Sequence, residues 1–213
     1  MKITSIIITY PPRYSNIRWI VEAIKKQTVQ SDIIIWDNGG QLEDIPGVTI
    51  IKSTRNFVCR PRFIISGLVT TDYIFNQDDD HIITDNRLFE KLIRESEENE
   101  GYFIGWSARK NYQLQPFHVP ADGKPTDFVN TGNSFYKTEL INNLNVSPYY
   151  DVEHRMTEEE YRYADDHWVS IQMPLKKTSL ILEGGMKELK TEGAISKENN
   201  HIAIRTDIAK RFF

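Results

Sequence analysis

Three consecutive aspartates, Asp78, Asp79 and Asp80, closely follow the strand-like segment Asp72–Asn76. Neighbouring carboxylates repel each other, and each pair costs on the order of 1 kcal/mol when partly desolvated. A bound cation relieves this repulsion, and oxygen ligands without cysteine or paired histidine favour Mg²⁺, Mn²⁺ or Ca²⁺ over zinc. Alternate residues of an extended segment share a face, so we expect Asp78 and Asp80 to bind a metal and Asp79 to point away, toward backbone or a basic side chain. A solvated turn is the alternative interpretation.

Arginines come shortly before the same strand, at Arg55, Arg60 and Arg62. A metal ion combined with arginine side chains is a common way for proteins to hold a diphosphate. Two other phosphate-binding patterns are missing from the sequence: there is no Gly-x-x-x-x-Gly-Lys-Ser/Thr segment, and no Gly-x-Gly-x-x-Gly follows the first strand. We therefore expect a metal-bridged diphosphate rather than a P-loop nucleotide or a dinucleotide.

A second acidic cluster lies between residues 151 and 166 and ends in the pair Asp165 and Asp166. This pair sits beside Tyr161, Tyr163 and Trp168, where two charges are costly unless they are used or satisfied. A carboxylate beside an electrophilic centre can accept a proton from an attacking hydroxyl group or stabilise a developing positive charge. We expect the pair to act in catalysis, and the alternative is a structural or helix-capping role.

The elements that must position these groups alternate between strand and helix in the first hundred residues. The expected strands are Ile3–Tyr10, Ser31–Trp36, Val48–Lys52 and Asp72–Asn76. Helical spacing begins near Asn16, and another helix is expected to start near Thr84 or Asp85. This alternation predicts a mostly parallel sheet wrapped by helices, which binds ligands beyond the carboxyl ends of its strands.

The second half of the chain has a different pattern, with aromatic strand-like segments and longer irregular stretches. The expected elements are a strand at Gly101–Ser107, a loop at Gln113–Thr126, a broken strand at Phe128–Tyr136, a helix at Thr157–Met173 and a short basic helix at Ile202–Phe213. No repeat or clear linker interrupts the chain, so residues 1–213 are predicted to form one domain.

Composition excludes several classes of protein. The chain has 213 residues, with 26 Lys and Arg against 30 Asp and Glu, and its net charge of −4 argues against a general nucleic-acid binder. Its longest apolar run is far short of the roughly 20 residues that span a bilayer, and the N-terminus lacks a secretory signal. The single cysteine, Cys59, rules out an internal disulfide. We expect a soluble protein of the cytoplasm.

Three segments resemble, in order and spacing, the opening of GT-A fold glycosyltransferases. They are Ile6–Tyr10, Ile33–Gly40 and Phe75–Asp80, within a match that covers residues 3–93. The resemblance implies a single GT-A α/β domain with a mostly parallel central sheet flanked by helices and a smaller, mixed acceptor-side region. It also implies a nucleotide diphosphate sugar, UDP-linked, as donor and Mn²⁺ or Mg²⁺ bound by a D-x-D motif. Residues 1–100 would form the nucleotide-sugar-binding half and residues 101–213 the acceptor-side half.

Residue roles follow from the same resemblance. Thr9, Tyr10 and Asp37 would contact the base. Asp78 would contact the ribose or the metal, and Asp80 would bind the metal, with Asp79 grouped among the donor-binding residues. Region 101–130 matches the family poorly, and this region shapes the choice of acceptor.

The later segments are similar to the exostosin-like branch of these enzymes. Asn56 and the following Arg62-Phe63 resemble its Asn…Arg-Phe segment. The spacing leaves open whether Arg60 or Arg62 contacts the diphosphate, and we assign the contact to Arg60. Ala164-Asp165-Asp166 resembles a Cys-Asp-Asp segment whose second aspartate lies by the anomeric carbon. His201-x-x-x-Arg205 resembles a C-terminal motif whose arginine reaches the phosphates.

The resemblance thus implies a hexosyltransferase-type enzyme that transfers a sugar to an acceptor hydroxyl on a glycan or glycoprotein. Asp166, Asp165 and Arg205 would be catalytic. A catalytically weak nucleotide-sugar-binding domain and a metal-dependent phosphotransferase are the alternatives. His201 as a third metal ligand stays open, and further domains of a longer chain are expected. The remaining histidines are expected to be surface or packing residues: His81, His118, His154 and His167.

Overall fold

A computed structural model describes most of the chain. The described residues are 1–98, 103–106, 112–114, 117–119, 125–126, 131–142, 155–157, 159–163, 167, 177–180, 185–189 and 198–212. Among these residues, no helix has the length and apolar character needed to cross a membrane.

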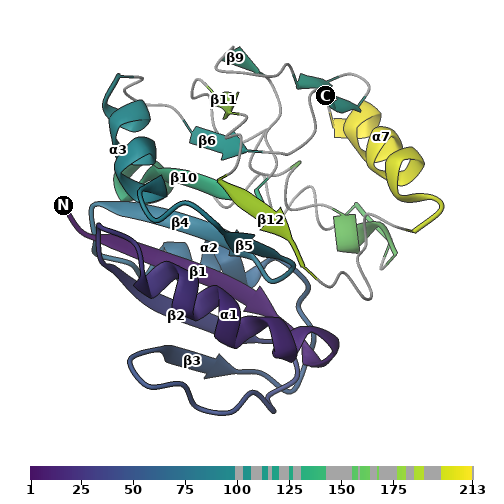
Figure 1. Ribbon diagram of the computed structural model, residues 1–213. Helices are drawn as coiled ribbons and strands as arrows, with labels where there is room; N and C mark the ends of the chain where they lie inside the picture. The colour runs from purple at the N-terminus through teal and green to yellow at the C-terminus, as the bar shows by residue number, and fades with distance from the viewer. Residues whose placement is uncertain are drawn as a thin grey trace.

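Four parallel strands form the first half of the central sheet, in the order β3-β2-β1-β4 (Figure 1). They are β1 (Ile3–Thr9), β2 (Ser31–Asp37), β3 (Thr49–Lys52) and β4 (Tyr73–Asp78). Runs of β-branched residues favour these strands, and β1 is buried on both faces, as expected for the centre of a parallel sheet. Ile8 of β1 lies opposite Asp78 of β4, and Thr9 of β1 lies opposite Asp37 of β2. The carboxyl ends of these three strands therefore lie at the same edge of the sheet.

The second half of the sheet is mixed in direction. β10 (Ser134–Lys137) runs antiparallel to β4 and is followed across the sheet by β6 (Phe103–Trp106), β11 (Lys177–Leu180) and β9 (Pro125–Thr126). The eight strands therefore form one continuous sheet that joins the two halves of the chain. This arrangement confirms the predicted fold class, a mostly parallel central sheet flanked by helices.

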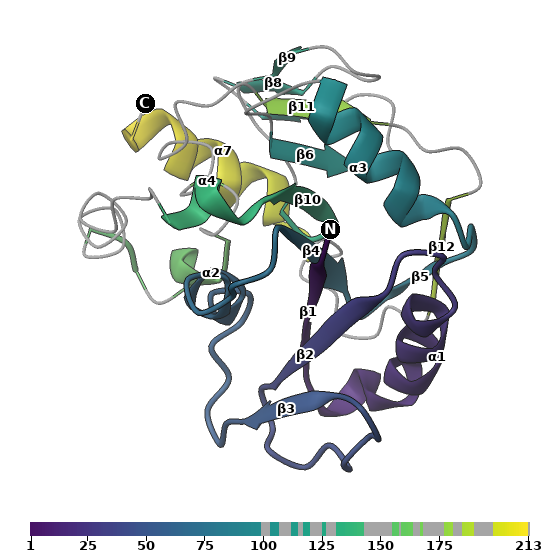
Figure 2. The ribbon, with the colours of Figure 1, turned by 90° about the vertical axis from the view of Figure 1, so that its left-hand side faces the viewer.

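Helices cover both faces of the sheet, with α1 and α2 on opposite sides of β1 (Figure 2). The helices are α1 (Tyr14–Lys25), α2 (Pro61–Ser66), α3 (Leu88–Glu98), α4 (Thr138–Asn142) and α7 (His201–Phe212). On one face, α1 and α3 pack on the larger apolar cluster. On the other, Phe63 and Ile65 of α2 and Ile141 of α4 pack with Ile6 and Ile74.

The spacing of apolar residues explains how α1 attaches to the sheet. Ile17, Ile20, Val21 and Ile24 recur at three- and four-residue intervals and are all buried. Burial of one such side chain contributes about 1.5–3 kcal/mol. A short 3₁₀ helix, η1 (Pro11–Arg13), turns the chain directly from β1 into α1, and this turn brings the start of α1 next to the carboxyl end of the sheet.

Several predicted boundaries were wrong because of pairing between distant segments. A strand, β5 (His81–Ile83), follows the aspartates, so the next helix begins at Leu88 rather than near Thr84 or Asp85. β5 pairs antiparallel with β12 (Met186–Glu188), about one hundred residues further along the chain. No local pattern signals such a partner.

The predicted loop at 113–126 was also wrong where the structure describes it. There β7 (Tyr112–Leu114) and β8 (Phe117–Val119) pair antiparallel, and β9 joins the main sheet. The predicted helix Thr157–Met173 includes a 3₁₀ helix, η2 (Glu160–Tyr163), and much of the rest of that prediction lies outside the described residues. The predicted C-terminal helix is confirmed as α7.

Candidate metal and nucleotide site

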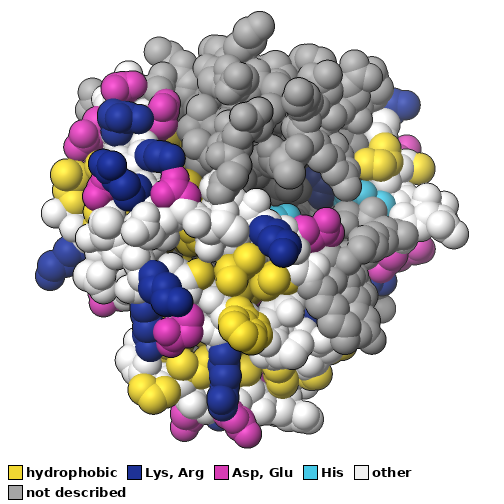
Figure 3. Space-filling view, viewed as in Figure 1, with side chains coloured by type: hydrophobic (Ala, Val, Ile, Leu, Met, Phe, Trp, Pro, Cys, Tyr) yellow, Lys and Arg dark blue, Asp and Glu magenta, His cyan; other side chains and the backbone are white. Residues whose placement is uncertain are grey.

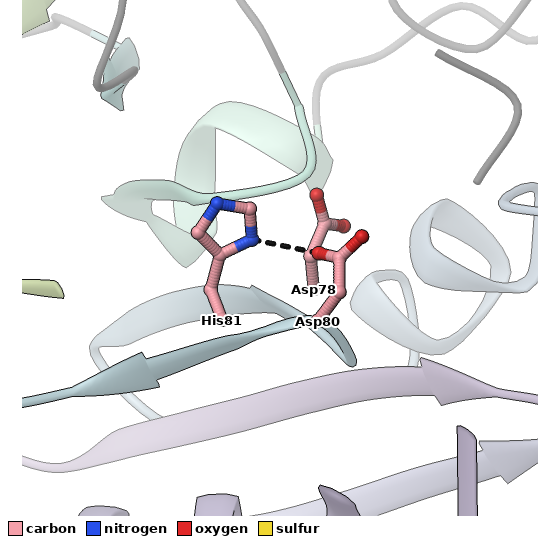
Figure 4. Close-up of side chains that lie close together, drawn as sticks. All are labelled: Asp78, Asp80 and His81. Atoms are coloured by element: carbon pink, nitrogen blue, oxygen red, sulfur yellow. Dashed lines mark hydrogen bonds and ion pairs between the residues drawn. The ribbon is translucent and has the colours of Figure 1, made fainter. Parts of the chain in front are cut away.

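Asp78, Asp80 and His81 bring three ligand atoms together at the carboxyl end of β4, within 4.8 Å of one another. Figure 4 shows the three side chains pointing to the same side of the strand. The Nδ1–H of His81 donates to Oδ1 of Asp80 at 2.7 Å. The side chains are between 13% and 29% exposed, which leaves the group accessible to an ion. Asp78 and Asp80 therefore lie together, as predicted, but Asp79 and Asp80 form a turn between β4 and β5 rather than the extended segment that the sequence suggested.

The donor set fits Mn²⁺ or Mg²⁺. Two carboxylates and one imidazole, with no cysteine among them, are ligands that borderline and hard divalent cations accept. The prediction that His81 is a surface or packing residue was wrong, because its ring lies with Asp78 and Asp80. Its place directly after the aspartates was a usable signal. His201, the open candidate for a third ligand, lies elsewhere: its ring packs edge-on against Tyr163, with 5.7 Å between ring centroids.

Arg62 is the ion-pair partner of Asp78. Its Nη2 donates to Oδ1 of Asp78 at 2.8 Å, and its Nη1 donates to the hydroxyl of Thr131 at 3.2 Å. The arginine side chain is only 2% exposed, so its charge is held inside the protein by these acceptors. Arg62 is thus an internal ion-pair partner of Asp78, one of the candidate metal ligands. Arg60, at the start of α2, is also buried, and its contact with a diphosphate stays a prediction.

Arg13 is the partner of the other two aspartates. Its Nη1 contacts Oδ1 of Asp79 and lies 3.0 Å from Oδ2 of Asp80. The amide of Asn16 donates to the backbone carbonyl of Asp79 at 2.9 Å. Asp79 therefore points away from the candidate metal group and toward a basic side chain, as predicted. Arg13 itself was missed, because the sequence Pro-Pro-Arg signals only the end of a strand.

The electrostatics of the group follow from burial and these contacts. Burial raises the pKa of Asp79, and the contact with Arg13 opposes that rise. Burial also acts to raise the pKa of Asp80, but hydrogen bonding to His81 and the charge of Arg13 outweigh it and lower the pKa. For His81, burial lowers the pKa, but Asp80 and Asp78 raise it more.

The described side chains leave the group with a small negative charge. With His81 neutral and the three carboxylates ionised, the two guanidinium groups of Arg13 and Arg62 leave a local net charge of −1. A divalent cation would change this to +1, which favours an anionic diphosphate. The surface around α3 differs from this group, because acidic and basic side chains alternate there (Figure 3) and form ion pairs such as that of Arg87 with Glu90.

The segment 131–134 packs against Asp78. The amide oxygen of Asn133 accepts from the backbone N–H of Asp78 at 3.1 Å. Gly132 lies directly beside the carboxylate, and Ser134 donates to the carbonyl of Thr131 at 3.1 Å. Asn133 and Gly132 therefore fix the position of Asp78.

A buried polar network lies beneath this segment and ties it to α2. The amide of Asn76 donates to Ser134 at 3.0 Å and to the hydroxyl of Tyr136 at 3.1 Å. Ser66 lies 3.0 Å from the same hydroxyl and donates to the carbonyl of Arg62 at 2.7 Å. Burial raises the pKa of Tyr136 to about 12, so it remains a neutral hydrogen-bonding group. The network holds β4, β10 and α2 in one arrangement around Asp78.

Asp37, at the end of β2, organises the loop that follows it. Its carboxylate accepts from the hydroxyl of Tyr14, from Gly39 N–H at 2.9 Å and from Leu42 N–H at 2.8 Å. Burial alone would raise the pKa of Asp37, but these hydrogen bonds outweigh it and lower the pKa. Burial and the contact with Asp37 raise the pKa of Tyr14 to about 12. The predicted contact of Asp37 with a base stays a prediction.

Thr9 and Tyr10 lie where the sequence analysis placed them, at the end of β1. The Thr9 hydroxyl oxygen is buried and has no hydrogen-bond partner among the described residues, while its carbonyl accepts from Asn38 N–H at 2.9 Å. The ring of Tyr10 lies 5.3 Å from the guanidinium carbon of Arg13. Register brings Thr9, Asp37 and Asp78 to one edge of the sheet, as expected.

Asn56 lies in an exposed loop between β3 and α2. Its side-chain oxygen accepts from Val58 N–H at 2.8 Å, and Val58 adopts a positive φ of 57°. The amide of Asn38 donates to the carbonyl of Val58 at 2.9 Å, which fastens the loop to the end of β2. The role of Asn56 in donor binding stays a prediction.

The proposed catalytic residues lie in the second half of the chain, where Asp165 and Asp166 are outside the described residues. Arg205 is described: it is buried on α7, and its Nη1 donates to the carbonyl of Tyr163 at 3.5 Å. Buried His167 lies with Nε2 2.8 Å from the carbonyl of Arg205, a packing role as expected. These contacts join α7 to η2, immediately before the aspartate pair.

Comparisons with known proteins found solved structures of similar fold, but no match to the sequence. No protein-family model and no curated protein matches the sequence. Crystal structures of TarS from S. aureus, a glycosyltransferase, are similar in structure. One TarS structure aligns with a TM-score of 0.58 and 13% identity over all of this chain and 43% of that chain.

Structures of TarS 1–349 in complex with UDP and with UDP-GlcNAc align with TM-scores of 0.58 and 0.59 and identities of 13% and 14%. Both alignments cover all of this chain and 70% or 71% of the other. At these identities the likeness concerns the fold alone, a mixed α/β domain with a mostly parallel central sheet flanked by helices.

Proposed function

We propose that this protein is a metal-dependent glycosyltransferase that moves a sugar from a UDP-linked donor to a hydroxyl group of a glycan or glycoprotein. The observation that carries the proposal is the group of Asp78, Asp80 and His81 at the carboxyl end of β4. Ligands of open α/β sheets bind at that end. The TarS complexes with UDP and UDP-GlcNAc support a nucleotide sugar as donor.

Each residue near the carboxyl ends has a proposed part in donor binding. Asp78, Asp80 and His81 would hold Mn²⁺ or Mg²⁺, which when bound neutralises charge on the diphosphate leaving group. Thr9, with its buried hydroxyl, and Tyr10 would contact the base together with Asp37. Asn56 and Arg60, from the loop before α2, would contact the diphosphate, while Asp79 holds the aspartate turn through Arg13.

In the proposed reaction, the acceptor hydroxyl attacks the anomeric carbon, and the bond from that carbon to the diphosphate oxygen breaks. If the reaction inverts configuration, Asp166 would accept the hydroxyl proton. If it retains configuration, Asp166 would stabilise the oxocarbenium-like centre, and the proton would pass to the departing diphosphate oxygen. Asp165 would support it, and Arg205 would assist the departing diphosphate. These three roles rest on the exostosin-like segments of the sequence.

Two finer proposals rest on resemblance alone. The Asn…Arg-Phe and Ala-Asp-Asp segments favour the exostosin-like branch of the GT-A enzymes. The chain as a whole also resembles the N-terminal transferase domain of a large chlorovirus glycosyltransferase, which would make it a viral protein acting in the host cytoplasm.

The test is donor binding and donor hydrolysis in the wild type and Asp80→Ala, each with Mn²⁺ and with EDTA. A thermal-shift screen of nucleotide sugars identifies the donor first, since a ligand at 100 times its Kd adds about 2.7 kcal/mol of stability. We expect Mn²⁺-dependent binding in the wild type and its loss in Asp80→Ala. Asp44→Ala is the matched control, because Asp44 is highly exposed and pairs only at the surface with Lys52.

The outcomes separate the candidate functions. Full Mn²⁺-dependent binding and hydrolysis in Asp80→Ala would remove Asp80 from the metal site. Donor binding without sugar release over hours would favour a binding domain over an enzyme. Release of phosphate rather than sugar from the donor would favour a phosphotransferase.

A further inference from the structure

Arg13 contacts two neighbouring aspartates: Asp80, which belongs to the candidate metal group, and Asp79, which does not. A single nitrogen, Nη1, contacts Asp79 and also lies 3.0 Å from Oδ2 of Asp80. The other oxygen of Asp80, Oδ1, accepts from His81 at 2.7 Å. Both oxygens of this carboxylate are therefore held, one by a guanidinium and one by another ligand of the group.

The local structure fixes the guanidinium before any ligand binds. Arg13 ends η1, where Pro11 and Pro12 restrict the backbone, and its N–H donates to the carbonyl of Tyr10 at 3.0 Å. Its side chain lies over the Tyr10 ring and is 9% exposed. From the next turn of the chain, Asn16 holds the backbone of Asp79. The start of α1 therefore holds the aspartate turn through both a side chain and the backbone.

We propose that Arg13 is a positioning residue of the metal site: it neutralises Asp79 inside the protein and orients Asp80 for the cation. This inference rests on the proposed metal site and adds to it a residue that holds no metal itself. Groups that orient a metal ligand from outside typically change metal affinity by about 10–100-fold when they are removed.

The sign of the charge effect makes the proposal testable. Loss of a positive charge next to the site should, by Coulomb attraction alone, strengthen cation binding. Loss of orientation should weaken it. A weaker affinity after removal of Arg13 therefore reports positioning and cannot come from charge.

Removal of Arg13 alone would leave Asp79 buried beside no cation, and the variant could fail to fold. The comparison is therefore made in an Asp79→Asn background, in which the Arg13–Asp79 pair is already absent. Asp79→Asn retains Arg13 beside Asp80, whereas Arg13→Met/Asp79→Asn removes it and keeps the interior free of an unpaired charge. Arg13→Lys/Asp79→Asn tests rescue, because one nitrogen makes both contacts.

Mn²⁺ alone is the probe, titrated by electron paramagnetic resonance on the full chain, with thermal unfolding recorded for each variant. We expect Asp79→Asn to bind Mn²⁺ within about threefold of the wild type and Arg13→Met/Asp79→Asn to bind at least about tenfold more weakly. The lysine variant should recover most of the loss. Arg18→Met is the control, since Arg18 lies on α1 in an exposed pair with Glu43.

Equal or tighter Mn²⁺ binding by Arg13→Met/Asp79→Asn than by Asp79→Asn would overturn the role of Arg13 and leave the proposed metal site standing. No Mn²⁺ binding by the wild type would overturn the metal site itself, and the role of Arg13 with it. Weak binding in the double variant with no recovery in the lysine variant would reduce Arg13 to a packing residue and contradict the proposal.

Discussion

Gly132 lies so close to Asp78 that a methyl group added at its Cα would meet a carboxylate oxygen of Asp78 at 2.0 Å. The same methyl group would lie 2.6 Å from the carboxylate carbon. Asp78 has little room to retreat, because its N–H is bound to Asn133 and its carboxylate to Arg62. Glycine at this position is therefore a condition for the observed geometry of the metal group.

Gly132→Ala should displace Asp78 from the metal group. We expect Mn²⁺ affinity to fall by about tenfold or more, and stability to fall by about 1–3 kcal/mol from overpacking. Isothermal titration with Mn²⁺ and urea unfolding measure the two effects. Gly67→Ala is the matched control, since its new methyl group would make only ordinary contacts, the nearest at 3.6 Å. Equal Mn²⁺ affinity in both variants would contradict the prediction.

Arg62→Met should break the ion pair with Asp78 and the hydrogen bond with Thr131. We expect a loss of about 1.5–3 kcal/mol in the free energy of unfolding, the range for hydrogen bonds to charged groups. Arg94→Met, which removes an exposed pair with Glu98, should change stability by less than about 0.5 kcal/mol. Urea denaturation distinguishes these outcomes, and a similar small change in both variants would show that Arg62 is not an internal counter-ion.

His81→Ala and His201→Ala together test which histidine is the third metal ligand. The structure places His81 with Asp78 and Asp80, and His201 against Tyr163. We expect weaker Mn²⁺ binding in His81→Ala and unchanged affinity in folded His201→Ala. The Mn²⁺ resonance spectrum offers a direct check, because loss of a nitrogen ligand alters the bound signal. The reverse result would assign the third ligand to the C-terminal motif.

Asp37 should make stability fall in acid. Its pKa is lowered in the folded protein below the unfolded value of about 3.9, so its stabilisation is complete above that pH and is lost as the pH falls through the folded pKa. In Asp37→Asn this loss should disappear, leaving a flatter curve of unfolding free energy at acid pH. Asp32→Asn, an exposed substitution in the same strand, is the control. Parallel curves for the wild type and Asp37→Asn would refute the assignment.

The sequence was sufficient for the parts of the fold that local pattern determines. The β-branched runs predicted β1 and β2 to within about a residue, and the apolar spacing of Ile17, Ile20, Val21 and Ile24 predicted α1. The sequence also predicted that Asp78 and Asp80 lie together, but the reason was wrong: a turn at Asp79 and Asp80, rather than alternation along a strand, brings them to one side.

Local pattern could not predict the partners of those aspartates. Arg13 is separated from Asp79 by 66 positions, and Thr131 from Arg62 by 69, so their contacts arise from the packing of η1, α2 and the segment before β10. Arg60 and Arg62 are two positions apart, and the local sequence did not show which of them pairs with an aspartate. A buried charge acquires its partner only when the chain has folded, and composition does not specify that choice.

The pairing of β5 with β12 has a consequence for how the protein can be divided. Leu189 N–H donates to the carbonyl of Asp80 at 2.6 Å, and Thr84 N–H donates to the carbonyl of Gly185 at 3.0 Å. The backbone around the metal group is thus completed by residues from near the C-terminus. Residues 1–100 are therefore not a separable module: a fragment ending near residue 100 would retain both acidic residues of the group, Asp78 and Asp80, yet leave β5 without the strand that fixes its path.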